Sequence, residues 1–275
     1  MKKILVPTDF SENAENAFDY AVTMAGTEEV EFILLNAYHA PNAGTGGMLV
    51  SITDVLRDES AKDLKAAVAD LQEKYTGLQI KGISLYGELL EVVDRVITSE
   101  NCDVVVMGTQ GASGLKKVLV GSNTEKVIRE VKIPVIAVPE NGEYSGFDHI
   151  VFATDMKVIN DARIMNPLLD VAKKFKARVS VLYVVKEGTE PKIDEDIERL
   201  RLEDYFEDIE HSYHVVFSND VEKGISQFLA DEGADLLAMI PRHVGFFDRL
   251  FKGSITQKFA YHTKTPLLAI HDTKE

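Results

Sequence analysis

Residues 4–9 read I-L-V-P-T-D, and residues 150–155 read I-V-F-A-T-D. A second pair of matching stretches follows in the same order. G-S-N-T-E-K-V-I-R-E-V-K-I-P-V-I-A-V begins at Gly121, and G-S-I-T-Q-K-F-A-Y-H-T-K-T-P-L-L-A-I begins at Gly253. Similarity that returns after so many residues indicates that one structural unit occurs twice. The sequence therefore predicts two similar domains in tandem.

Within each repeat, short apolar runs alternate with longer stretches of helical period. This alternation is typical of a parallel sheet covered by helices on both faces. The polar, glycine-bearing stretch 141–146 is the expected linker, which places the domains at residues 1–140 and 147–275. The predicted fold class is α/β, with two tandem doubly wound, Rossmann-like domains. Each is expected to have a five-stranded parallel sheet in the order 3-2-1-4-5.

Each repeat is predicted to carry five strands. In the first repeat they are expected at residues 3–7, 31–38, 79–85, 103–107 and 134–138, with helices at 11–25, 51–75, 88–99 and 122–130. In the second repeat the strands are expected at residues 149–153, 178–185, 211–217, 234–240 and 266–270, with a shorter second helix at 194–209. Both sets follow the order of elements that a doubly wound domain requires.

The composition is that of an ordinary globular protein. The 275 residues suffice for two domains that each bury a core, and 45% of them are hydrophobic and 27% charged. The formal net charge of -15 repels nucleic-acid phosphates and anionic lipid surfaces, so neither kind of partner is expected. An anionic ligand then needs a defined pocket, in which backbone dipoles or a few lysines overcome the overall charge.

The sequence favours neither a membrane nor secretion. The apolar run at the N-terminus meets Pro7 and Asp9 after a few residues, and no stretch reaches the roughly 20 apolar residues of a membrane-spanning helix. The single cysteine, Cys102, precedes an apolar run and is expected to be a buried or half-buried thiol without a redox role. We therefore expect a cytoplasmic protein.

Glycines with a defined spacing follow the strand expected at 103–107. The segment reads G-T-Q-G from Gly108 to Gly111, then nine residues, then the pair Gly121 and Ser122 at the start of a helix. Glycines allow positive φ and let backbone amides approach a ligand, and a helix N-terminus attracts phosphate. The segment therefore predicts a phosphate-binding loop at the carboxyl end of the fourth strand.

Two of the candidate positions also have structural interpretations. Ser122 and Glu125 fit a capping box, in which both side chains satisfy amides of the first helical turn. Asp9 ends the first strand and would face Gly108 across the crevice of the sheet. A carboxylate there can accept hydrogen bonds from a ribose or from an adenine amino group. Asp9 would otherwise cap the first helix together with Ser11.

These residues carry a resemblance to a known family. The opening P-T-D-F-S from Pro7 and the spaced G-x-x-G, nine residues, G-S pattern resemble the ATP-binding branch of the universal stress proteins. The similarity to the tandem form of that family covers nearly the whole chain. The resemblance implies that ATP binds with its adenine and ribose near the Asp after the first strand and the end of the second strand. It also implies that the triphosphate lies along the glycine loop with a divalent ion, magnesium or manganese.

Ten positions match the nucleotide-binding pattern of that family. The resemblance places Pro7, Thr8 and Asp9 beside the base and ribose, Ala37 in backbone contact with adenine, Met107 and Gly108 beside the ribose and phosphates, and Gly111, Gly121, Ser122 and Asn123 around the phosphates. Because members of the family pair through their last strands, it also implies an internal pseudo-dimer in which the strands at 134–138 and 266–270 meet. The sequence identifies no protein partner and leaves open whether two chains form a homodimer.

The second repeat departs from the pattern. Aligned on Gly253, the two earlier glycines become Ile240 and His243, and a β-branched Ile resists positive φ. Bulky side chains would fill the space of a triphosphate, namely Phe246, Phe247, Leu250 and Phe251. We therefore expect no ATP in this half. A metal site is not expected either, because His243, His262 and His271 match no compact zinc signature.

Familiar catalytic motifs are missing from the sequence. It contains no G-x-x-x-x-G-K-[ST] loop, no G-x-G-x-x-G after the first strand, and no Ser/His/Asp or Cys/His arrangement that can be placed together. At most slow hydrolysis of bound ATP is expected, because no residue is identified that would position an attacking water. The sequence thus predicts an ATP-binding regulator of a stress response that uses its first domain only. The alternatives are a slow ATPase and a structural stress protein without nucleotide.

Overall fold

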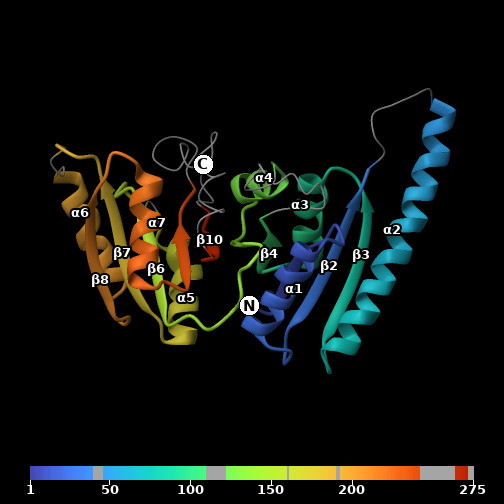
Figure 1. The fold of residues 1–275 in the computed structure, drawn as a ribbon, viewed down its shortest axis with the longest axis horizontal. Coiled ribbons are helices and arrows are strands. Elements are labelled where there is room, and N and C mark those ends of the chain that lie inside the picture. The colour runs from blue at the N-terminus through green and yellow to red at the C-terminus, as the bar shows by residue number, and fades with distance from the viewer. Residues whose placement is uncertain (40–45, 110–121, 160, 190–192, 242–263, 272–275) are drawn as a thin grey trace.

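The computed structural model describes residues 1–39, 46–109, 122–159, 161–189, 193–241 and 264–271. This part of the chain folds as two α/β halves that lie side by side, the first drawn in blue and green and the second in yellow to red in Figure 1. Among the described helices, none is long and apolar enough to cross a membrane. The fold class predicted from the repeats is confirmed.

Strands and helices alternate along both halves. The first half contains β1 (Lys3–Pro7), α1 (Glu12–Ala25), β2 (Glu31–Tyr38), α2 (Gly46–Lys74), β3 (Gln79–Tyr86), α3 (Leu89–Glu100), β4 (Val104–Gly108), α4 (Ser122–Glu130) and β5 (Val135–Val138). The second half contains β6 (His149–Thr154), a short 3-10 helix (Ala162–Met165), α5 (Asn166–Phe175), β7 (Arg178–Val185), α6 (Ile193–Tyr205), β8 (His211–Phe217), α7 (Val221–Glu232), β9 (Leu236–Met239) and β10 (Leu267–Ala269).

The boundaries differ from the prediction mainly at two helices. Helix α2 begins at Gly46, ahead of the predicted residue 51, and Figure 1 shows its first turns rising beyond the end of β3. Helix α6 ends at Tyr205, ahead of the predicted residue 209. It ends there because the N–H of Ile209 donates to the carbonyl of Phe206 at 2.8 Å, in a turn that leads into β8.

The ten strands found in the described residues form one sheet in the order β3-β2-β1-β4-β5-β10-β9-β6-β7-β8. Within each half all neighbouring strands are parallel and follow the predicted order 3-2-1-4-5. The two last strands, β5 and β10, pair antiparallel, with Leu268 opposite Ile136. This pairing joins the halves into the pseudo-dimer that the resemblance implies.

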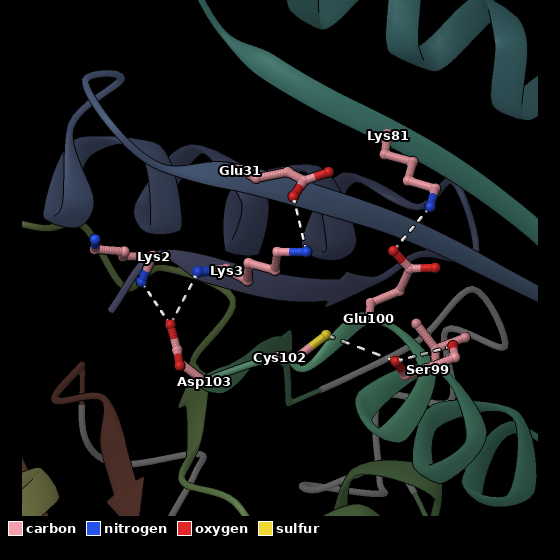
Figure 2. A network of polar contacts seen from close by, with 9 residues as sticks. Lys2, Lys3, Glu31, Lys81, Ser99, Glu100, Cys102 and Asp103 are labelled. Carbon is pink, nitrogen blue, oxygen red and sulfur yellow. Dashed lines mark hydrogen bonds and ion pairs between the residues drawn. The ribbon is translucent and has the colours of Figure 1, made fainter.

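The same backbone clamp lies at the amino end of both half-sheets. The Asp103 carboxylate, just before β4, accepts hydrogen bonds from the N–H groups of Lys2 (2.6 Å) and Lys3 (3.0 Å) at the start of β1, as Figure 2 shows. Asp235, just before β9, accepts two bonds of 2.9 Å from the N–H of His149 and from that of the preceding residue. The repeat in the sequence therefore extends to individual hydrogen bonds.

A buried thiol lies next to the first clamp (Figure 2). Cys102 is buried, and its Sγ lies 3.9 Å from the carbonyl oxygen of Val96. Burial raises the pKa of the Cys102 thiol to about 11, so it is protonated at neutral pH. The expectation of a buried thiol is confirmed.

Tyr144 in the linker connects the cores of the two halves. Its ring makes edge contacts with Tyr20 of α1 (5.5 Å between centroids), with Phe147 (5.0 Å) and with Phe175 of α5 (6.1 Å). On this face of the sheet, buried side chains from both halves form one hydrophobic cluster. The halves are therefore joined by side-chain packing as well as by the sheet.

Candidate functional site

A tight turn follows β1. The Thr8 hydroxyl oxygen accepts from the N–H of Phe10 (3.0 Å), and Asp9 Oδ1 accepts from the N–H of Ser11 (3.2 Å). Phe10 adopts a φ of 60°, and Ser11 is the N-cap of α1, because its side chain accepts from the N–H of Ala14. The alternative prediction, that Asp9 helps Ser11 to cap the first helix, is therefore confirmed in part. Asp9 supports the capping serine, and it is also an exposed residue at the carboxyl end of β1.

The second half repeats this turn after β6. Thr154 Oγ1 accepts from the N–H of Met156 at 3.0 Å, and Met156 adopts a φ of 53°. Asp155 Oδ1 accepts from the N–H of Lys157 at 3.2 Å, as Asp9 does from Ser11. The two turns differ in the side chain of their fourth residue, which is Ser11 in the first half and Lys157 in the second. The Lys157 ammonium lies 3.4 Å from the Asp155 carboxylate, which is thereby paired with a cation of its own turn.

Gly108 ends β4 at a point where α1 comes very close. A Cβ on Gly108 would lie 2.8–3.0 Å from three atoms of Asn13, namely Nδ2, Cγ and the backbone oxygen. Gly108 is not among the described glycines with positive φ, so the expectation of positive φ at this position is wrong. Glycine is required here because a helix packs against the end of a strand, and a side chain would have no room.

The first turn of α4 lies against the end of β4. The buried Thr124 hydroxyl donates to the Gly108 carbonyl at 2.9 Å, and the neighbouring Asn123 is exposed. The first N–H groups of a helix have no partner within it, so this end of α4 suits an anion. The Thr109 hydroxyl is buried and has no hydrogen-bond partner within the described part of the chain.

The predicted site residues gather at one edge of the sheet. β1 lies between β2 and β4, so the carboxyl ends of these three strands meet where the chain connections diverge, the usual ligand position in such sheets. The predicted residues that the structure describes at this edge are Pro7, Thr8, Asp9, Ala37, Met107, Gly108 and Asn123. Pro7 and Met107 are buried, Thr8 and Ala37 half-buried, and Asp9 exposed.

A chain of buried hydrogen bonds lies behind this edge and was missed by the sequence prediction. Ser84 of β3 lies 2.5 Å from Ser60 of α2, and the Ser60 hydroxyl donates to Asn36 Oδ1 at 2.6 Å. Asn36 Nδ2 donates to the Thr8 carbonyl at 2.8 Å. Asn36 and Ser60 are only 7% and 5% exposed. The one signal in the sequence is an asparagine inside the apolar run F-I-L-L-N-A of β2.

Comparison with known proteins assigns the two repeats to a family. Residues 1–139 and residues 146–271 each match the model of the universal stress protein family. The chain belongs to this family. A universal stress protein of Methanocaldococcus jannaschii is 29% identical over 152 residues, which cover 50% of this chain and 94% of that protein. Half of this chain therefore aligns with nearly all of a shorter relative.

Solved universal stress proteins share the fold. The structure of one from Archaeoglobus fulgidus covers 99% of this chain and 97% of its own, with a TM-score of 0.71 and 22% sequence identity. A universal stress protein solved in complex with cAMP covers 50% of this chain and 96% of its own, at 23% identity and a TM-score of 0.39. The first of these matches spans both domains of the tandem universal stress protein described here.

The second domain of this universal stress protein has a different crevice. Ile240, the residue aligned with Gly108, is buried. The described residues 155–159 after β6 form no helix, and the N–H of Ile159 donates to Glu198 of α6 at 3.2 Å. Glu198 is fully buried and forms an ion pair of 3.8 Å with Arg201. In the second domain an isoleucine therefore follows β9, and a buried carboxylate of α6 contacts the segment that follows β6.

Several predicted positions of the universal stress protein lie outside the described residues. They include Gly111 and Gly121 of the glycine loop, His243 and His262, and the bulky residues Phe246, Phe247, Leu250 and Phe251. For Ser122 the backbone is described as the first residue of α4, but not the side chain. The predicted phosphate contacts and the capping box at Ser122 therefore stay predictions.

A divalent ion has no ready ligand set in the described ranges of this universal stress protein. They contain no group of three or more His, Cys, Asp or Glu side chains that could hold a metal ion. Magnesium prefers to be bound through a few carboxylates together with substrate phosphates.

Proposed function

We propose that this protein is an ATP-binding regulatory protein of a stress response, with one nucleotide in a first domain at residues 1–140 and none in a second domain at residues 147–275. The observation that carries the proposal is the contrast between the two matched turns. Asp9 follows β1, whose neighbour β4 ends in Gly108. Asp155 is paired with Lys157, and the residue of the second domain that aligns with Gly108 is the buried Ile240.

The contrast matters because the base and ribose of a nucleotide bind through different groups from its phosphates. A ribose hydroxyl or an adenine amino group needs an acceptor, and the exposed Asp9 supplies one at the carboxyl end of β1. A triphosphate needs backbone N–H groups that it can approach closely, which the N-terminus of α4 and glycines supply. In the first domain Asp9 Oδ1 accepts from the N–H and the hydroxyl of Ser11, whereas in the second domain the Asp155 carboxylate lies 3.4 Å from the Lys157 ammonium.

The proposed contacts follow the edge of the sheet. The base and ribose lie against Pro7, Thr8, Asp9 and Ala37, the ribose and phosphates against Met107 and Gly108, and the phosphates against Gly111, Gly121, Ser122 and Asn123. Adenine-nucleotide binding occurs in this family, as the member solved with cAMP illustrates. A magnesium or manganese ion would be held mainly by the phosphates.

Regulation follows from the position of the phosphates. ATP bound along residues 108–122 would fix one arrangement of that segment, and a protein partner would read the resulting surface. Hydrolysis is not required for such a switch, because a ligand that prefers one conformation shifts the population toward it.

Two measurements test the proposed function. Mass spectrometry of small molecules released from freshly purified protein should detect an adenine nucleotide. Replacing Gly111 by Val should abolish ATP binding in calorimetry, because a β-branched side chain blocks the approach of the phosphates to the backbone. Nucleotide-free preparations that bind no added ATP would contradict the proposal, and so would a Gly111→Val variant that binds ATP as the wild type does.

A further inference from the structure

The carbonyl of Thr8, the residue after β1, accepts a hydrogen bond from a side chain of β2. Asn36 Nδ2 donates to the carbonyl of Thr8 at 2.8 Å, and Asn36 Oδ1 accepts from the Ser60 hydroxyl at 2.6 Å. Because Ser60 donates to Asn36, Ser84 is the donor of the 2.5 Å bond between the two serines. Three hydrogen bonds thus run in one direction, from β3 through α2 and β2 to the end of β1.

The register of β1 and β2 makes the Thr8 carbonyl the next acceptor of the β1–β2 ladder. The N–H of Glu31 donates to the Lys2 carbonyl, and the N–H of Thr8 donates to the Leu35 carbonyl, both at 2.8 Å. The odd-numbered residues of β2 therefore direct their peptide groups toward β1. The next bond of this ladder would run from the N–H of Ala37 to the Thr8 carbonyl, and in the described residues that carbonyl accepts from Asn36 Nδ2.

We infer that Asn36 is a positioning residue, which ends the β1–β2 ladder one bond early and leaves the N–H of Ala37 for the ligand. The inference rests on the proposed function and deepens it, because it names the side chain that keeps the Ala37 N–H available to the base. A backbone N–H at the carboxyl edge of a sheet suits an unprotonated ring nitrogen of a purine such as adenine. Ser60 and Ser84 hold the Asn36 amide in the orientation that this role requires.

The first test needs no ligand. Amide hydrogen exchange, read by NMR at Ala37 in nucleotide-free protein, should be fast in the wild type. In Asn36→Ala it should be slower by about tenfold or more, because the Ala37 N–H then pairs with the vacated Thr8 carbonyl. An Ala37 amide that is already protected in the wild type would overturn the inference, whatever the protein binds.

The second test separates the base from the phosphates. Calorimetry with adenosine and with inorganic tripolyphosphate would compare the wild type with Asn36→Ala and Ser60→Ala. We expect adenosine affinity to fall by about tenfold in Asn36→Ala and by less in Ser60→Ala, while tripolyphosphate affinity stays within about twofold. An equal loss for both ligands would point to a merely structural role and overturn the inference, as would unchanged adenosine affinity.

A matched control comes from the second half. Ser180 is a buried serine of β7 whose hydroxyl lies 2.8 Å from His149 Nε2, and it is remote from the first crevice. Ser180→Ala should lower stability much as Ser60→Ala does and leave adenosine affinity unchanged. A wild type that binds no ATP would refute the proposed function itself, and the exchange test at Ala37 would still decide the role of Asn36.

Discussion

At Gly108, strand β4 ends within contact distance of Asn13 on α1. Gly108→Ala would place a methyl group 2.8 Å from Asn13 Nδ2 and 2.9 Å from the Asn13 backbone oxygen. We expect this overpacking to lower the free energy of unfolding by about 1–3 kcal/mol. Urea denaturation followed by circular dichroism measures the change.

The double variant Asn13→Ala/Gly108→Ala tests whether the effect is steric. Asn13→Ala removes the side-chain atoms nearest to the new methyl group but leaves the backbone oxygen in place. The double variant should therefore be more stable than the sum of the two single effects predicts. Strict additivity would show that contact with the Asn13 side chain is not the cause.

His149 is buried at the start of β6, where Nε2 lies 2.8 Å from the Ser180 hydroxyl and Nδ1 lies 3.1 Å from the Arg178 guanidinium. Burial, and next the charge of Arg178, lower the pKa of His149. The folded state therefore binds this proton less readily than the unfolded state does. Stability should fall as the pH drops below the unfolded-state value of about 6.5, and this loss should level off below the folded-state pKa.

The variant His149→Gln isolates this contribution. It lacks the titrating group, so its melting temperature should fall less steeply than that of the wild type between about pH 6.5 and pH 5. Thermal denaturation at a series of pH values gives both curves. Parallel curves would mean that another group controls stability in this range.

Among the elements, the strand pairs β1–β4 and β6–β9 are tied by the two aspartate clamps. Asp103→Asn and Asp235→Asn keep the side-chain size but remove a charge that strengthens two hydrogen bonds to backbone N–H groups. Each should lower the free energy of unfolding by about 1–2 kcal/mol. Because the clamps lie in different halves, the double variant should lose the sum in chemical denaturation. A variant as stable as the wild type would contradict the role given to its clamp.

Most elements could be predicted from the sequence because buried parallel strands are short apolar runs between turn residues. β1, β2, β7 and β8 begin and end at the predicted residues. The reason for Gly108 could not be predicted, since it is a contact between α1 and β4 that exists only in the folded chain. The hydrogen-bond chain through Asn36 was missed for the same reason, as its members come from β3, α2, β2 and the end of β1.

The candidate site was predictable only in outline. The T-D sequence at the end of β1 marks a turn, and the structure forms the same turn at both occurrences. What distinguishes the two turns is the residue two places after the aspartate, Ser11 or Lys157. Whether that lysine pairs with its aspartate or points elsewhere depends on a side-chain conformation that a sequence pattern does not specify.

At the scale of the whole molecule, the two halves share one sheet and two hydrophobic clusters, so the chain should unfold as a single unit. Tyr144→Ala removes the ring that contacts both Tyr20 and Phe175. It should lower stability by about 2–3 kcal/mol and weaken the coupling of the halves. In scanning calorimetry the ratio of van't Hoff to calorimetric enthalpy should be near one for the wild type and should fall below one for the variant.

A tyrosine within a single half provides the control for this experiment. Tyr75 is half-buried and donates to Asp19 at 2.8 Å within the first half. Tyr75→Ala should lower stability and change the enthalpy ratio less than Tyr144→Ala does. The bridging role of Tyr144 would be excluded if both variants kept the ratio of the wild type.

The central claim is that only one of two matched domains binds a nucleotide, and calorimetric titration with ATP and magnesium tests it most directly. The wild type should bind about one ATP per chain. Asp9→Ala should weaken binding by about tenfold or more, while Asp155→Ala, which alters the matching turn, should leave binding unchanged. Two equal sites, no site in nucleotide-free protein, or equal effects of the two substitutions would contradict the account.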